Sequence, residues 1–516
     1  MRVSKAIIII IISSAAAAAK SAETVAPCCA SLQNAPNLDG KIYLPNSASY
    51  RARLDSYWSI NAALPPWCMV LPSSSEDVSV VIKTLAKHQC HFGIRGGGHG
   101  QFPLASSVES GVTIDFGNMN STTWNPETKL ASVEPGSHWQ AVYETLAPFG
   151  IVVAGARVAE VGVGGYLTGG GLSFHQSSHG MGCDNVTNFE VVLASGEIVN
   201  ANASSNPDLW KALKGSSGNL GLVTRFDMYS IEYADQTKPV VWGGTVRFPE
   251  SSGHEIADAM IDFTDNIHKD ENSSTILAWA YDPERSTGPV ISAAIFNAEA
   301  RVKPAAFDGF YSVDGMSSDN TRVATLTEHT ADLGFGLDAG YHDVWYTGAF
   351  QSDARPVKFA ADRFAKLIQE LEQVAPSPVS GLTTSLLFQP LSKSMTDKGI
   401  RNGGNVVGLD RFTAKANGVL VLLIAAVKDA ESEKLIEPKL AKFMDDVDAY
   451  SAALRLKWEW RYLNYASGMQ DAVASYGTKV ISKIRAVANK YDPQGVFQNL
   501  RASGFKIPMD ITKDEL

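Results

Sequence analysis

A series of glycine-rich loops between residues 93 and 221 constrains the fold more than any other feature of the sequence. The first loop, "GIRGGGHGQF", puts three glycines directly before His99. The chain has 43 glycines in 516 residues, above the usual share of roughly 7%. Glycine permits sharp turns and lets the backbone come close to a ligand. We therefore expect several tight loops around one bound ligand, with His99 held at the end of one of them.

The common glycine motifs for phosphate binding do not fit these loops. A P-loop needs Gly-Lys-Ser/Thr at the start of a helix, but here His99 follows the third glycine. A Rossmann fingerprint fails because Leu167 stands where its third glycine belongs, after Gly162 and Gly164. Each cluster alone is also compatible with ordinary tight turns. Taken together, the loops are suited to a long, polyanionic ligand whose pyrophosphate accepts backbone N–H bonds.

Several classes of function are disfavoured by composition and motifs. The chain is 45% hydrophobic and 19% charged, as in a soluble globular protein, and its net charge is -10. This charge argues against nucleic acid and anionic membranes as partners. There is no G-x-S-x-G elbow of a hydrolase. The ten histidines show no zinc-binding spacing, so no metal is expected.

The two ends of the sequence carry targeting signals. "MRVSKAIIIIIISSAAAAAK" indicates a signal peptide over residues 1–19, since its apolar run is shorter than the ~20 residues of a membrane span. No other segment is long and apolar enough to span a membrane, so none is expected in the mature chain. Residues 513–516 read Lys-Asp-Glu-Leu, a signal for retention in the endoplasmic reticulum. We expect the lumen of that compartment if the signal is used, and secretion otherwise.

Cysteines and glycosylation sequons fit the secretory route. Five cysteines allow two disulfides and leave one thiol over: Cys28, Cys29, Cys68, Cys90 and Cys183. The expected bridges join Cys68 to Cys90, or one of these to Cys28 or Cys29. Sequons occur at Asn120, Asn202 and Asn272. A fourth, at Asn185, lies in an expected cofactor segment, so we expect it to be unmodified.

Hydrophobic patterns divide the chain into three parts. Up to about residue 235, short strands alternate with helices, for example a strand over 68–71, a helix from Ser75 and a strand over 92–94. From 236 to 456, strands such as "VVWGGTVRF", "TTSLLFQPL" and "GVLVLLIAAV" mix with long amphipathic helices. This mixture predicts an α+β domain with one antiparallel sheet. The remainder carries polar aromatic residues and a terminal helix.

A set of motifs in one order resembles a known family. They include "PPWCMVLPSSSEDV", "IRGGGH", "VEPGSHWQAVY", "VGVGGYLTGGG", "GMGCDNV", "DLWKALKGSSGNLGLVT" and "YLNYA…KYDPQGVF". The chain resembles the FAD-linked oxidoreductases of the vanillyl-alcohol oxidase class, in the berberine-bridge-enzyme branch, and is most similar to secreted fungal enzymes of secondary metabolism. The resemblance implies a PCMH-type, two-subdomain FAD-binding domain at 60–235 and an α+β substrate domain at 236–456. It also implies a C-terminal element at 457–510 that returns to the flavin.

The resemblance further implies how FAD is bound. The ring of His99 would be joined covalently to the flavin 8α-methyl carbon, and residues 95–98 would surround the pyrophosphate. Many members add a second bond from a cysteine, but Val158 stands at that position, so a single tether is expected. Val161 matches the position that gates O2, which favours an oxidase. The full cofactor-binding set is His99, Arg95, Gly96, Gly97, Gly98, Gly100, Val161, Gly162, Gly164, Gly165, Gly169, Gly170, Asp184, Asn185, Gly221 and Val223.

The C-terminal "WRYLNYA" is similar to the catalytic element of the family. Tyr465 matches its base, with Tyr462 and Asn464 beside it. A phenol has a reference pKa near 10, so Arg461 or the flavin field would have to favour its ionised form. Ser467 replaces a family acidic residue. Gln389 and Asn405 are expected to face the flavin, whereas Cys183 is expected to be a buried structural thiol.

These features predict an oxidase acting on a small organic biosynthetic intermediate. Hydride would pass from a substrate C–H to flavin N5 while Tyr465 helps to remove a proton, and O2 would then be reduced to H2O2. Three alternatives stay open at this point: an oxidative cyclase, a sugar or alcohol oxidase, and a non-catalytic flavoprotein that serves as a partner subunit.

Overall fold

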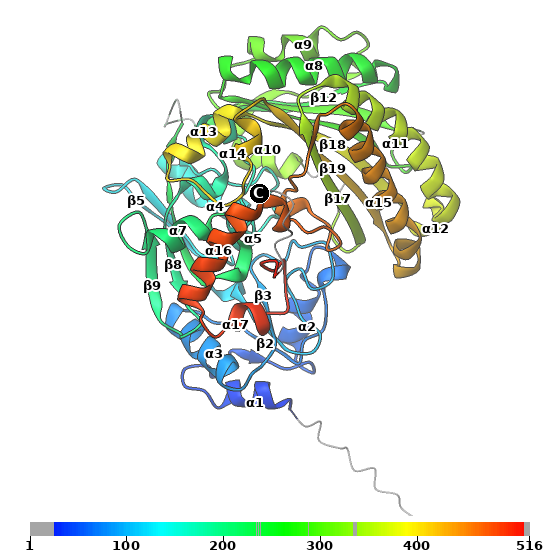
Figure 1. The fold of residues 1–516 in the computed structure, drawn as a ribbon. Coiled ribbons are helices and arrows are strands. Elements are labelled where there is room, and N and C mark those ends of the chain that lie inside the picture. Colours follow the sequence, from blue (N-terminus) through cyan, green and yellow to red (C-terminus); the bar gives the residue numbers. More distant parts are fainter. Residues whose placement is uncertain are drawn as a thin grey trace, which may run out of the picture.

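The computed structural model describes residues 25–509, except 234, 236, 238, 287 and 334–337. The expected signal peptide and the terminal Lys-Asp-Glu-Leu lie outside the described residues. Two small sheets form the lower part of the molecule, and a large sheet with its helices forms the upper part (Figure 1). In the part of the chain that is described, no helix is long and apolar enough to cross a membrane.

The first small sheet contains the strand that leads into the first glycine loop. Its order is β1 (Ile42–Tyr43), β2 (Cys68–Val70), β4 (Val112–Asp115) and β3 (Phe92–Arg95), with β4 parallel to both β2 and β3. Helix α3 (Ser75–Lys87) connects β2 to β3, and the Ser74 hydroxyl caps it by accepting from the Asp77 N–H. Its apolar residues are buried at helical spacing, as expected. This sheet already includes residues N-terminal to position 60.

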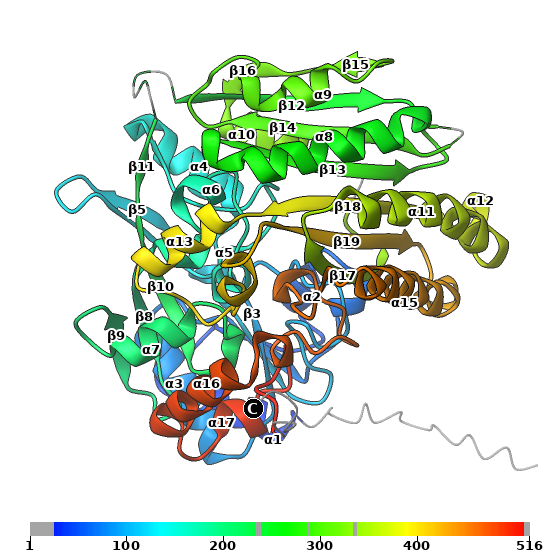
Figure 2. The same cartoon turned by 45° about the horizontal axis from the view of Figure 1, so that its top comes forward.

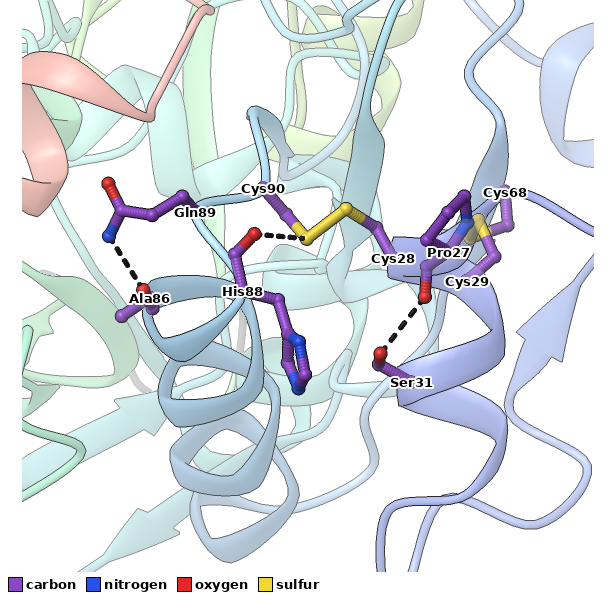
Figure 3. The surroundings of a disulfide bond; sticks show 9 residues. All are labelled: Pro27, Cys28, Cys29, Ser31, Cys68, Ala86, His88, Gln89 and Cys90. Atoms are coloured by element: carbon purple, nitrogen blue, oxygen red, sulfur yellow. Dashed lines mark hydrogen bonds between the residues drawn. A yellow bond between two sulfur atoms is a disulfide. The ribbon is translucent and has the colours of Figure 1, made fainter.

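The N-terminal residues are attached to this sheet by two disulfides (Figure 3). Helix α1 (Pro27–Gln33) carries Cys28, which is bridged to Cys90, and Cys29, which is bridged to Cys68. The expectation that Cys68 or Cys90 pairs with Cys28 or Cys29 therefore holds, and a Cys68–Cys90 bridge is wrong. Cys183 is free and buried, as expected.

The second small sheet is antiparallel and has five strands. Its order is β5 (Thr122–Asn125), β6 (Leu130–Val133), β10 (Leu222–Tyr229), β8 (Val186–Val192) and β9 (Ile198–Asn202). The other elements of this part are α2 (Ala48–Leu54), α4 (Trp139–Leu146), α5 (Val163–Thr168), α6 (Gln176–His179), α7 (Pro207–Leu213) and the short pair β7 (Ile151–Val152) and β11 (Ile231–Glu232).

The large sheet is antiparallel, and its strands run from β12 (Val240–Phe248) to β20 (Lys457–Trp458) in sequence. Its order is β15-β12-β14-β13-β18-β19-β17-β20, and β16 also pairs with β12. The other strands are β13 (Ser273–Tyr281), β14 (Val290–Asn297), β15 (Ser318–Asp319), β16 (Arg322–Thr325), β17 (His342–Gln351), β18 (Thr383–Leu391) and β19 (Gly418–Val427). Three sequence-predicted strands coincide with β12, β18 and β19.

Both faces of the large sheet are buried. Helices α8 (Gly253–Asn266), α9 (Asp308–Tyr311), α11 (Ala354–Val374) and α15 (Ala430–Ala453) cover one face (Figure 2). Successive strand residues alternate between the faces, so Val421 and Leu423 pack under the helices while Leu422 and Ile424 face the two small sheets. The smaller helices here are α10 (Leu326–Asp332), α12 (Ser377–Ser380), α13 (Lys393–Arg401) and α14 (Asp410–Thr413).

The C-terminal segment returns to the small sheets. Helix α16 (Thr478–Tyr491) packs on α7, and α17 (Val496–Asn499) follows it. Beyond α17, the Phe92 N–H donates to the Leu500 carbonyl and the Ala502 N–H to the Phe92 carbonyl. The end of the chain is thus held beside β3, and the expected α+β organisation with a returning C-terminal segment is confirmed.

Candidate active site

A cavity of about 560 Å³ lies between the small sheets and the large sheet. Its walls come from the glycine loop after β3, the segment 156–168 that runs into α5, the large sheet, and the C-terminal segment. These segments are distant in sequence, so only the tertiary fold makes the cavity. It contains most of the site residues expected from the sequence.

The two glycine loops are packed directly against each other. A Cβ on Gly97 would lie 2.5 Å from the Gly162 Cα, and a Cβ on Gly162 would lie 2.5 Å from the Gly97 Cα. Both distances are shorter than any tolerated carbon–carbon contact, so each position requires glycine. A Cβ on Gly165, by contrast, would meet nothing within 4 Å, although Gly165 lines the cavity. The loops thus leave open space beside exposed backbone.

His99 stands at the end of the first loop and lines the cavity. Its ring stacks on Trp58, with ring centroids 4.5 Å apart and an interplanar angle of 28°. The loop is fixed there because the Trp58 N–H donates to the Gly98 carbonyl. Burial, with a smaller contribution from His138, lowers the pKa of His99 to about 4. The imidazole is therefore neutral at neutral pH and keeps one nitrogen lone pair.

Tyr465 lies in the same cavity with two hydrogen-bond donors on its phenol oxygen. Arg157 donates from Nη2 at 3.0 Å, and Gln389 donates from Nε2 at 3.4 Å. Arg157 also donates to Gln389 Oε1, so the two side chains hold each other in place. A guanidinium and an amide aimed at one oxygen stabilise negative charge there. This triad of Tyr465, Arg157 and Gln389 is the chemically distinctive part of the cavity.

Tyr462 and Asn464 support Tyr465 from behind. The Tyr462 hydroxyl accepts from the Gly171 N–H at 3.0 Å and from Asn464 Nδ2 at 3.1 Å. Its ring lies edge-on to that of Tyr465, with centroids 4.8 Å apart. Burial raises the pKa of Tyr462 above its usual value, so this phenol stays neutral. Both residues line the cavity.

Most of the expected cofactor-binding residues line this one cavity. They are Gly96, Gly97, Gly98, His99, Gly100, Val161, Gly162, Gly164, Gly165, Gly221 and Val223, and Val158 also lies there.

Arg95, the first of the four residues expected to surround the pyrophosphate, lies outside the cavity lining. Its guanidinium is buried 3.4 Å from the Asp115 carboxylate and 3.8 Å from the centre of the Tyr57 ring. It also donates to the carbonyls of Arg53 and Ser56. Arg95 therefore fixes the start of the glycine loop from outside the cavity, because its charge is satisfied by the protein.

Five more residues that were expected to contact the cofactor do not line the cavity. Gly169 and Gly170 pack against Asn464 and Met181. Asp184 accepts from Asn405 Nδ2, and Asn185 donates to the His179 and Met181 carbonyls, in a separate small pocket and its surroundings. The idea that Asn405 faces the flavin is thus not supported by its position, whereas Gln389 does line the cavity. These polar groups satisfy one another.

Arg461 was one of two candidates, with the flavin field, for favouring the ionised form of Tyr465, but it pairs with Asp448. Arg157 is the arginine that contacts the Tyr465 phenol oxygen. No motif in the sequence around Arg157 predicted this contact. Arg501 also lines the cavity and was not expected from the sequence. Its guanidinium donates to Asn219 Oδ1 and to backbone carbonyls, and burial lowers its pKa to about 9.

Comparison with known proteins agrees with this site. Residues 66–202 match the model of an FAD binding domain. Together the fold and the domain define a flavin-dependent oxidoreductase. The chain is 36% identical over 496 residues to an FAD-dependent monooxygenase of Aspergillus calidoustus, covering 94% of this chain and 91% of that protein. An FAD-dependent monooxygenase of Emericella nidulans is 35% identical over 484 residues, covering 93% and 98%. The chain belongs to the same family of FAD-dependent oxidoreductases as these fungal proteins.

Solved structures share the whole fold at low sequence identity. The structure of 6-hydroxy-D-nicotine oxidase from Arthrobacter nicotinovorans has a TM-score of 0.71 at 20% identity, covering 92% of this chain and 98% of that one. A BBE-like protein of Physcomitrella patens gives 0.70 at 15%, covering 95% and 100%. Glucooligosaccharide oxidase from Acremonium strictum, with its 6-S-cysteinyl, 8α-N1-histidyl FAD, gives 0.71 at 17%, covering 93% and 98%.

The residues present fit FAD. The paired loops offer backbone that no side chain shields, as Gly165 shows. Arg501, with no carboxylate partner among the described residues, gives its part of the cavity a positive charge suited to a pyrophosphate. No cluster of metal-ligating side chains occurs within the described ranges.

Proposed function

We propose that this protein is an O2-using oxidase that removes hydride from a small organic biosynthetic intermediate, with FAD held covalently by His99. The observation that carries the proposal is the position of the Tyr465–Arg157–Gln389 triad in the cavity that also contains His99. Bound FAD supplies hydride acceptance and reoxidation by O2, with release of H2O2.

The proposed tether rests on the state and position of His99. A covalent bond to the ring needs a nitrogen lone pair, and the low pKa of His99 keeps one available. Its stacking on Trp58 holds the imidazole in one orientation toward the cavity. The second tether is excluded chemically at position 158, because valine has no thiol. Four of the five cysteines are in disulfides, and Cys183 is buried outside the cavity lining.

Tyr465, as its phenolate, is proposed to accept the proton of a substrate O–H or N–H while hydride leaves the adjacent carbon. Arg157 and Gln389 hold the phenol oxygen in place and stabilise negative charge on it. Tyr462 and Asn464 fix the ring from the other side. Trp345 contacts it edge-on, with centroids 5.8 Å apart, so the base is oriented on three sides.

O2 is proposed as the electron acceptor because Val161, a small residue, lines the cavity at the family's gating position. The curated relatives are called monooxygenases, which makes monooxygenation the second candidate. An oxidase forms one H2O2 per substrate oxidised, whereas a monooxygenase inserts one oxygen atom into the product. Peroxide yield and product mass therefore separate the two, and a cyclase is recognised by ring closure.

The test begins with purified protein, acid-precipitated and run on a denaturing gel under ultraviolet light, beside His99→Ala. A fluorescent band in the wild type that is lost in the variant supports the tether. FAD released into the supernatant of the wild type would contradict the tether and leave FAD binding intact. A protein without flavin would contradict the proposed function, and a flavin that no small molecule bleaches anaerobically would favour a non-catalytic partner subunit.

The location proposed for this enzyme is the secretory pathway, with retention in the endoplasmic reticulum if residues 513–516 are read. Two disulfides favour an oxidising compartment. Asn120 is exposed and is the best candidate for a glycan, whereas Asn185 is buried.

A further inference from the structure

The part of the cavity next to Tyr465 has an apolar wall. The wall is formed by one face of the large sheet, and its side chains are Ile276, Trp345, Leu387, Leu422 and Ile424. Such side chains offer a bound molecule no hydrogen bonds except through the Trp345 N–H. A substrate rich in hydroxyl groups would lose its hydrogen bonds to water against this wall without replacement. The wall therefore fits the apolar, ring-sized body of a substrate better than a sugar.

Arg157 is the charged residue that contacts Tyr465 in this cavity, which Glu160, Asp338 and Arg501 also line. The residue is 6% exposed and lines the cavity. Only its Nη2 atom donates hydrogen bonds within the described part of the chain, to Gln389 and Tyr465. No carboxylate among the described residues forms an ion pair with it. A buried guanidinium whose other donors lack acceptors is costly unless a ligand supplies them.

Arg501 provides an internal comparison, because it is a second buried arginine on the same cavity without a carboxylate partner. All three of its guanidinium nitrogens donate, to Asn219 Oδ1 and to the carbonyls of Phe497, Ser503 and Phe505. In Arg157 the Nε and Nη1 atoms have no hydrogen-bond acceptor among the described residues. Arg157 is thus the buried arginine that retains donors for a molecule in the cavity.

We propose that Arg157 recognises an acidic oxygen of the substrate, and that the substrate is an apolar ring compound bearing a carboxylate or an ionised phenol or enol. Its body packs on the sheet wall, and its anionic oxygen accepts from the unused Arg157 donors. Arg157 then serves twice, as it also orients Tyr465. This inference rests on the proposed function, since it assigns a substrate class to the same cavity.

An acidic group on the substrate would also help to position the reacting bond, in addition to strengthening binding. An anion paired with Arg157 lies next to the phenol oxygen of Tyr465, which Nη2 of the same guanidinium contacts at 3.0 Å. The acidic group would therefore place the reacting O–H or N–H within reach of Tyr465. A neutral analogue of the same shape would offer the unused Arg157 donors an uncharged acceptor, which forms weaker hydrogen bonds, and would bind more weakly for that reason.

The test compares 2-naphthoate with 2-naphthamide, which has the same ring and no charge, by calorimetric titration of flavin-loaded enzyme at pH 7.5. We expect the acid to bind at least about tenfold more tightly, the discrimination that a charge-assisted hydrogen bond supplies. Arg157→Gln should abolish this preference and Arg157→Lys should keep part of it. Cellobiose should not compete with the acid.

Glu160→Gln is the matched control, because Glu160 is an exposed residue at the cavity and its change leaves Arg157 intact. It should retain the preference for the acid. Equal binding of acid and amide by the wild type, or a preference that survives in Arg157→Gln, would overturn the inference. Flavin content, measured on every preparation, separates the two proposals: loaded enzyme without acid preference refutes only the substrate class, whereas absence of flavin refutes the proposed function.

Discussion

The Nη2 atom of Arg157 lies 3.0 Å from the phenol oxygen of Tyr465, although 308 positions separate the two residues in the chain. Arg157 comes from the segment before the second glycine loop, and Tyr465 from the C-terminal segment. Gln389, from β18 of the large sheet, completes the contact. Each of the three parts of the molecule thus contributes one member of the triad. A substitution at any of them tests whether the parts act together.

Tyr465→Phe removes the phenol oxygen and leaves the ring in its aromatic contacts. Loss of a general base lowers the rate of flavin reduction by about 10²–10⁴-fold, while flavin content and thermal stability stay near wild type. Stopped-flow bleaching of the flavin under anaerobic conditions measures that rate once a substrate is found. Tyr229→Phe is the control, since Tyr229 is 52% exposed on β10. Unchanged bleaching in Tyr465→Phe would rule out the base.

Gly97→Ala places a methyl group against the Gly162 backbone, where neither loop has a side chain that can yield. Overpacking of this kind costs about 1–3 kcal/mol of the free energy of unfolding, and the displaced loops should bind less FAD. Thermal melts and the ratio of visible to ultraviolet absorbance report the two effects. Gly288→Ala should be neutral, because a Cβ there would meet nothing within 4 Å. A fully loaded, stable Gly97→Ala protein would contradict the close packing.

Asp343 makes stability depend on pH. Burial raises the pKa of this carboxyl to about 8, from its ordinary value of 3.8. The folded state therefore keeps a proton that the unfolded state loses, so stability falls as pH rises from about 4 to 8, by at most about 1.4 kcal/mol per pH unit. Asp343→Asn should raise the melting temperature at pH 8 and flatten its pH dependence. Asp332→Asn, at an exposed carboxylate, should leave the slope unchanged.

Thiol labelling distinguishes the five cysteines. Iodoacetamide should modify no cysteine of the native protein and only Cys183 after denaturation without reductant, because the other four are bridged and Cys183 is buried. Peptide mass spectrometry after proteolysis identifies the bridged pairs. Replacing Cys28 and Cys90 together by alanine should lower the free energy of unfolding by about 2–4 kcal/mol. A Cys68–Cys90 peptide would contradict the structure.

Much of the fold could be predicted from local patterns. Strand β19 was predicted with both of its ends, because its ten residues, apolar after Gly418, are buried on both faces of the sheet. Helix α3 was predicted from the acidic residues of its first turn and from its buried positions. The glycine loops were predicted as ligand-binding backbone, and their close packing is the reason for glycine at Gly97 and Gly162.

The family resemblance predicted individual site residues, which local patterns could not do. It was less successful for polar side chains that form hydrogen bonds or ion pairs within the protein. Asp184 and Asn185 lie in a family motif, yet they bond to neighbouring groups outside the cavity lining. The expected contact of residues 95–98 with a pyrophosphate stays a prediction, and the Arg95 guanidinium is paired with the buried Asp115. An ion pair formed inside the protein removes that charge from ligand binding.

The sequence by itself determined the family, the secondary structure and the glycine loops, because these depend on residue type and short-range spacing. Only the tertiary structure decided which arginine faces Tyr465: Arg461, four residues away in sequence, pairs with Asp448, and Arg157 takes its place. The same holds for the partners of Cys28 and Cys29. These pairings depend on which distant groups the folded chain brings together and on which charged groups are already paired within the protein. No local sequence pattern contains that information.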